Sequence, residues 1–201
     1  MEGAVFYWFL WLWWVYTTFL MRKTAPHRLK LSAGILLVIT CGKVYVKTPL
    51  FDVPLVGILL VFLITILTYP NHFWRMLRFA ASSLILMSAY VSFRLIELYD
   101  PVWVLFGRTA MLSASGFLLV QILEHNLKSR IVVLIGGFLS GDILFAFLLS
   151  KHAIPYESMS LGFLDLIACA STLTVAWTGF CQMTQAISNS IQQRKRRQAI
   201  P

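Results

Sequence analysis

Three charged side chains interrupt apolar stretches that are long enough to cross a membrane. They are Arg108, Asp142 and Asp165, and each lies in a different stretch. A lone charge inside a bilayer costs at least ~2.5 kcal/mol, so such groups usually face other helices, where they pair or become neutral. We therefore expect Arg108 to pair with Asp142 or with Asp165.

Two further charged residues, Arg94 and Glu97, lie near the end of an earlier apolar stretch. On the topology given below, all five charges fall in the outer half of the membrane, with Arg108 roughly 9 Å deep. They predict either a salt-bridge network that joins helices or a polar cavity open to the outside. In the cavity interpretation, Asp142 and Asp165 bind a cation or proton, and Arg108 sets their pKa values or binds an anionic group.

Other membrane chemistries require patterns that this sequence does not complete. Ser140-Gly141-Asp142 resembles the Gly-x-Gly-Asp of intramembrane aspartyl proteases only in part, because Leu139 replaces the first glycine. The 4 histidines have no metal-binding spacing, and the 3 cysteines form no Cys-x-x-Cys pair. We expect no catalytic residue, no metal ion and no cofactor, and hence no enzyme.

The apolar stretches predict an all-α fold, a polytopic membrane helical bundle. The chain is 59% hydrophobic and 12% charged, which is outside the range of soluble domains. About seven stretches could span the membrane: 4–21, 31–46, 53–69, 77–98, 102–123, 131–149 and 161–181. We expect residues 1–181 to form one transmembrane domain and 182–201 a basic cytoplasmic tail. Whether 31–46 spans fully is left open, because it is short and carries Lys43.

The positive charges predict the orientation. With the amino end outside, most of the 17 lysines and arginines fall on the inner side, which is the bias of cytoplasmic loops. Omitting the span 31–46 would put the basic tail outside, so seven spans with the carboxyl end inside fit better. This clustering between apolar stretches also argues against nucleic acid as a partner. Beyond the bilayer itself, anionic lipid headgroups are a candidate partner of the basic tail residues: Arg194, Lys195, Arg196 and Arg197.

Small residues predict where helices approach closely in lipid. The helix-packing candidates are Gly137, Ser140, Gly141, Ala168 and Thr172. The glycine strip is turned about 100° or more from Asp142 on the same helix, so we expect the glycines and the acid to meet different neighbours. A homo-oligomer, or a complex with another membrane protein, would need the Gly137–Gly141 strip at an outer surface.

The opening MEGAVFYWFLWLWWVYTTFLMRKTAPHRLKLS, together with the chain length and the seven-span layout, resembles the YphA-like membrane proteins of bacilli. The resemblance implies a bacterial plasma-membrane protein without an established activity, and it transfers no site residue. Together with the embedded charges, it predicts a non-enzymatic membrane protein, either a small-solute or ion transporter or a sensor. The alternative is a structural or assembly partner of other membrane proteins, in which the charges form a structural salt-bridge network.

Overall fold

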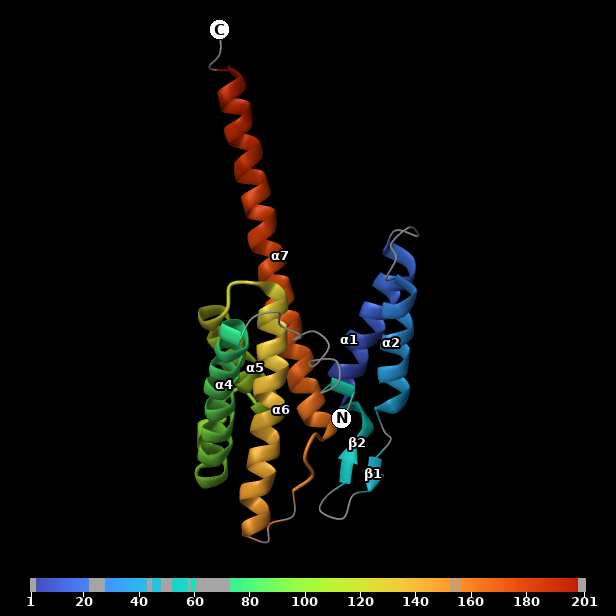
Figure 1. Ribbon diagram of the computed structural model, residues 1–201, viewed down its shortest axis with the longest axis vertical. Coiled ribbons are helices and arrows are strands. Elements are labelled where there is room, and N and C mark those ends of the chain that lie inside the picture. The colour runs from blue at the N-terminus through green and yellow to red at the C-terminus, as the bar shows by residue number, and fades with distance from the viewer. Residues whose placement is uncertain are drawn as a thin grey trace.

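The computed structural model describes residues 3–21, 28–42, 45–47, 52–57, 59–60, 73–152, 154 and 156–198. The described part is a helical bundle with one short antiparallel hairpin (Figure 1). Its helices are α1 (Ala4–Val15), α2 (Arg28–Cys41), α4 (Phe73–Tyr99), α5 (Arg108–Leu123), α6 (Leu127–Lys151) and α7 (Leu161–Gln198). A π-helical turn, Tyr16–Leu20, extends α1, and a 3-10 turn, Pro101–Trp103, precedes α5. Residues 55–57 and 59–60 are also helical.

Among the described residues, three helices are long and apolar enough to cross a bilayer. They are Met76–Tyr99 in α4, Leu127–Lys151 in α6 and Leu161–Asn189 in α7. The shortest of them has 24 residues, or roughly 36 Å at the α-helical rise, against a hydrocarbon layer of ~30 Å. Helices α1, α2 and α5 are apolar but shorter. The predicted helical fold, with helices that could span a membrane, is therefore confirmed.

The predicted second and third spans differ from the structure at the hairpin. Helix α2 has 14 residues and ends at Cys41, so it covers only about 21 Å. Strand β1 (Tyr45–Lys47) follows it and pairs with β2 (Asp52–Pro54), with Val46 opposite Val53. The helix gives way at Gly42, where a side chain would collide with the hydroxyl of Tyr7. Residues 61–69 of the predicted span 53–69 lie outside the described residues.

Helix α5 begins six residues later than the predicted span 102–123 does. Pro101 opens the 3-10 turn, in which Asp100 accepts a hydrogen bond from the backbone of Val102 (3.1 Å). Gly107 has φ 83°, a left-handed conformation that other residues rarely adopt. Arg108 is therefore the first residue of α5 and lies at a helix end instead of deep within a span.

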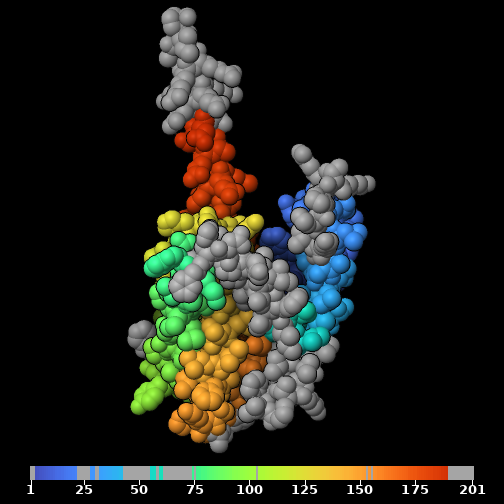
Figure 2. Space-filling model, in the orientation of Figure 1, coloured from blue at the N-terminus to red at the C-terminus, as the bar shows by residue number. Residues whose placement is uncertain are grey.

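The helices pack in pairs, α4 along α6 and α5 along α7, while α1 contacts α7 and α2 (Figure 1). Leu86, Leu134, Phe138 and Leu164 are almost fully buried between them. We call the end of the bundle where α4 and α6 finish and α5 and α7 begin the hairpin end. At the opposite end, α7 continues beyond the other helices, as Figure 2 shows.

The predicted glycine strip lies inside the chain, at the contact between α6 and α4. A methyl group added to Gly137 would lie 2.7 Å from Cβ of Leu86, and one added to Gly141 would lie 2.8 Å from Cδ1 of Tyr90. Both distances are shorter than van der Waals contact, so these two positions have room for no side chain. The strip is therefore not available to a second protein, and the partner hypothesis loses this surface.

Ser140 and Thr172, which are also predicted to pack between helices, form hydrogen bonds within their own helices. The hydroxyl of Ser140 donates to the carbonyl of Gly136 (2.8 Å), and that of Thr172 donates to the carbonyl of Ala168 (2.7 Å). Ala168 also packs against the buried core. Polar side chains thus lie in the bundle without requiring a partner on another helix.

Replacing Gly141 by Ala tests the close contact of α4 and α6. We expect a lower midpoint of thermal unfolding in detergent, because Tyr90 must move and such overpacking typically costs ~1–3 kcal/mol. The matched control is Gly179→Ala in α7, where nothing lies within 4 Å of the added methyl group and Ala favours the helix. Equal midpoints for the two variants would contradict the contact.

Candidate functional site

A cavity of about 260 Å³ lies at the hairpin end, between α4, α5, the start of α7 and the loop that joins α6 to α7. Seven of its lining residues are polar or charged: Tyr90, Arg94, Arg108, Thr109, Tyr156, Ser160 and Asp165. Leu112, Phe163 and Leu166 line it with apolar side chains. The five predicted site residues thus gather around one end of the bundle, although three of them, Arg94, Arg108 and Asp165, line the cavity itself.

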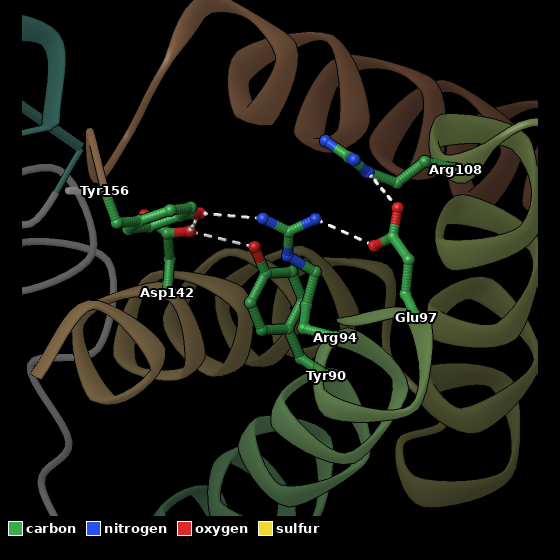
Figure 3. Close-up of polar contacts among 6 residues, drawn as sticks. All are labelled: Tyr90, Arg94, Glu97, Arg108, Asp142 and Tyr156. Atoms are coloured by element: carbon green, nitrogen blue, oxygen red, sulfur yellow. Dashed lines mark hydrogen bonds and ion pairs between the residues drawn. The ribbon is translucent and has the colours of Figure 1, made fainter. Parts of the chain in front are cut away.

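Arg94 is held in place on two sides by hydrogen bonds (Figure 3). Its Nη1 lies 2.8 Å from Oε2 of Glu97, one helical turn further along α4, and its Nη2 lies 3.3 Å from the hydroxyl of Tyr156. The guanidinium also lies 4.8 Å from the ring centre of Phe145, in a cation–π contact. The side chain of Arg94 is only 10% exposed. These contacts hold it in one position in the wall of the cavity.

Arg108 pairs with the same glutamate but leaves most of its guanidinium unoccupied. Its Nε lies 2.5 Å from Oε1 of Glu97, so that Glu97 bridges two arginines and joins α4 to α5 (Figure 3). Its side chain is 59% exposed. Neither Nη1 nor Nη2 of Arg108 has a hydrogen-bond partner in the described part of the chain. Two hydrogen-bond-donating nitrogens with positive charge are thus open to a ligand.

Asp142 is fully buried and is satisfied by neutral donors. Its Oδ1 accepts hydrogen bonds from the hydroxyls of Tyr90 (2.8 Å) and Tyr156 (2.6 Å), and its Oδ2 accepts one from the backbone N–H of Met159 (2.6 Å). Met159 has φ 56°, a conformation uncommon outside glycine. The carboxylate therefore fixes the α6–α7 loop and the turn at Met159, and Arg108 does not contact it.

Asp165 caps the amino-terminal end of α1. Its two oxygens accept hydrogen bonds of 2.7 Å from the backbone N–H groups of Gly3 and Phe6. The first N–H groups of a helix have no partner within it, and they carry partial positive charge. The expected pairs of Arg108 with Asp142 or Asp165 are therefore wrong, because tyrosine hydroxyls and backbone amides satisfy both carboxylates while Arg108 starts its helix beside Glu97.

The expectation that the glycines and Asp142 meet different neighbours holds for Gly137, which faces Leu86, and is wrong for Gly141. The ring of Tyr90 packs on Gly141, and its hydroxyl reaches Asp142. A long aromatic side chain can cover one face of a helix with its ring and reach the next with its polar tip.

Sequence reasoning from embedded charges missed the two tyrosines and one buried acid. Tyr90 was detectable, because it shares a helical face with Arg94 and Glu97 at positions i, i+4 and i+7. Glu124, at the end of α5 opposite the cavity, is 1% exposed and pairs with Arg78 at 3.3 Å. It lies just beyond the predicted span 102–123, which hid it from a search for charges inside spans.

The described residues contain no group of three or more metal-ligand side chains that could hold a metal ion. Both aspartates already accept two or three hydrogen bonds, which leaves the exposed guanidinium of Arg108 as the charged group most open to a ligand. The arrangement is suited to binding a charged solute.

Comparison with known proteins matches the chain over residues 2–200 to the family described as YphA-like integral membrane protein. The chain is similar to the uncharacterised protein YphA of Bacillus subtilis (strain 168), with 29% identity over 177 residues, which are 85% of this chain and 83% of that protein. No solved structure matches the chain.

Replacing Asp142 by Asn tests its role as the anchor of the loop. An amide keeps one acceptor oxygen and loses the charge, so the hydrogen bonds that the two carboxylate oxygens accept are weakened or rearranged, at a cost of about 1.5–3 kcal/mol. We expect faster hydrogen exchange of the Met159 amide and a lower unfolding midpoint. The control is Glu157→Gln, which makes the corresponding change at an exposed carboxylate of the same loop. Unchanged exchange at Met159 in Asp142→Asn would count against the anchor.

The pKa of Tyr156 predicts how stability depends on alkaline pH. Burial, and next the charge of Asp142, raise the pKa of Tyr156 from 10.0 to about 12. Since the unfolded chain releases this proton first, the stabilisation is complete below pH 10 and is lost as the pH rises toward 12. We expect the unfolding free energy to fall more steeply over this interval in the natural protein than in Tyr156→Phe. Parallel curves for the two proteins would refute the coupling.

Proposed function

The chain belongs to the family of YphA-like integral membrane proteins, and on that premise we propose that it binds a small charged solute in the cavity at the hairpin end. The binding serves transport or sensing and involves no catalysis. The observation that carries this proposal is Arg108, which lines a polar cavity and has two guanidinium nitrogens without a hydrogen-bond partner among the described residues. Charged groups in membrane bundles that face a cavity are typical of solute pathways.

We further propose that the cavity opens to the outside of a bacterial plasma membrane. The distribution of positive charge supports this orientation: Arg78, Lys128 and Arg130 lie at the end opposite the cavity, where α7 also projects. An excess of basic residues is typical of the cytoplasmic side. The basic residues at 194–197, which follow in the same helix, would then lie near anionic lipid headgroups.

A structural role is the second candidate, and the hydrogen bonds and ion pairs that the carboxylates already form favour it. Glu97 joins α4 to α5 through Arg108, and Asp142 joins α4 to α6 through Tyr90. A purely structural network needs no open donor, however. The unpartnered nitrogens of Arg108 are the feature that separates the two functions.

Ligand-dependent stabilisation tests the proposed function. A solute that binds only the folded protein raises its stability by RT ln(1 + [L]/Kd). We expect at least one member of a panel of acetate, phosphate, ethylamine, glycine and valine, at millimolar concentration, to raise the unfolding midpoint of the purified protein. Arg108→Ala should abolish the increase.

The control is Arg78→Ala at the opposite end of the bundle. Arg78 is 61% exposed and pairs with Glu124, which is 1% exposed, while Arg108 is 59% exposed and pairs with Glu97, which is 11% exposed. The two variants therefore remove the same kind of surface ion pair, and only one of them removes a cavity donor. No stabilisation by any solute, or equal loss in both variants, would reject solute binding and leave the structural role.

A further inference from the structure

We propose that the ligand of the cavity is a small zwitterion that carries a carboxylate and an ammonium group, of the class of an aliphatic amino acid. This inference rests on the proposed function. It follows from the placement of the two signs of charge around the cavity, from the cavity's net charge and from its size and apolar wall.

The positive side of the cavity comes from α4 and α5. Arg108 presents Nη1 and Nη2 without partners in the described structure, and these two nitrogens match the two oxygens of a carboxylate. Arg94 lies next to it through the shared Glu97 and adds a second positive charge to the same wall. The hydroxyl of Thr109, beside Arg108 at the start of α5, also lines this wall.

The negative side comes from α7. Asp165 lines the cavity, and its oxygens accept one backbone N–H group each. A carboxylate has about four acceptor positions, so it can accept further hydrogen bonds from an ammonium group. Ser160 and Tyr156 also line the cavity and carry hydroxyl groups.

The sum of charges argues against an anionic ligand, and the position of the two arginines argues against a simple cation. The two arginines face three carboxylates in the described region: Glu97, which bridges the arginines, Asp142, which is fully buried, and Asp165. A simple anion would add a further negative charge to this excess, and a simple cation would have to enter beside two guanidinium groups. Uncompensated charge is costly in a protein interior. A zwitterion brings both charges and adds none to the sum.

The size and the apolar wall define the rest of the ligand. A cavity of about 260 Å³ lies below the ~300–1,000 Å³ of pockets for drug-sized ligands, and so suits a metabolite of few heavy atoms. Leu112, Phe163 and Leu166 form its apolar side. This wall would contact an aliphatic side chain, such as that of valine.

A matched set of three solutes tests this assignment: valine, isovalerate, which lacks the ammonium group, and isobutylamine, which lacks the carboxylate. We expect the dissociation constants of isovalerate and isobutylamine to be about tenfold or more larger than that of valine. They are measured from the dependence of the unfolding midpoint on solute concentration. Asp165→Asn should reduce the difference in affinity between valine and isovalerate. Arg108→Ala should reduce the difference in affinity between valine and isobutylamine.

The outcomes separate the two proposals. If isovalerate or phosphate binds as tightly as valine, the zwitterion assignment fails and solute binding stands. If none of these solutes and no member of the panel in the preceding test stabilises the natural protein, both proposals fail. Because the comparison of the three solutes in the natural protein decides the matter alone, an Asp165→Asn variant that does not fold leaves the result intact.

Discussion

The buried carboxylate of Asp142 is the contact on which the hairpin end of the bundle depends. A charge removed from water is stable only when hydrogen bonds replace its hydration. Asp142 obtains three of them, from α4 through Tyr90 and from the following loop through Tyr156 and Met159. One side chain of α6 thereby sets the position of a helix and of a loop that both line the cavity.

That contact requires the close approach of two helices. Tyr90 can cover Gly141 and still reach Asp142 only because α6 presents no side chain at position 141. Apolar association gives little preference for one register in lipid, since the tails are as apolar as the side chains. The glycine and the buried acid act together. Gly141 allows the two helices to approach closely, and Asp142 stabilises one register of the helices through its hydrogen bond with Tyr90.

The cavity inherits its rigidity from the same group of residues. Tyr156 links Asp142 to Arg94, and Glu97 links Arg94 to Arg108 (Figure 3). Each member up to Glu97 has partners on both sides, and only Arg108 ends the series in an open position. Because Glu97 and Arg94 are already held in position, a ligand that contacts Arg108 has to order fewer side chains on binding, and this lowers the entropy cost.

The sequence predicts the long helices well, because α4, α6 and α7 are continuous apolar stretches whose length alone determines that they can span. It predicts the close glycine contact for a similar reason, since Gly137 and Gly141 have a fixed helical spacing. The partners of the charges follow from less visible features. Gly107 delays the start of α5 and so places Arg108 beside Glu97. The aspartates are satisfied by hydroxyls and amides, which a search for opposite charges does not consider.

The bond between Asp165 and the start of α1 has a consequence for the amino-terminal helix. Asp165 contacts the backbone N–H groups of Gly3 and Phe6, and a backbone amide is the same in every residue except proline. The point at which α1 begins is thus fixed through backbone groups, while Phe6 adds the packing of its ring in the core. Trp8, Trp11 and Phe19 are exposed, as suits residues that meet lipid. Within this fold, these three exposed aromatic residues are therefore open to replacement by other apolar residues, while a single acid on the last helix holds the point at which the first one begins.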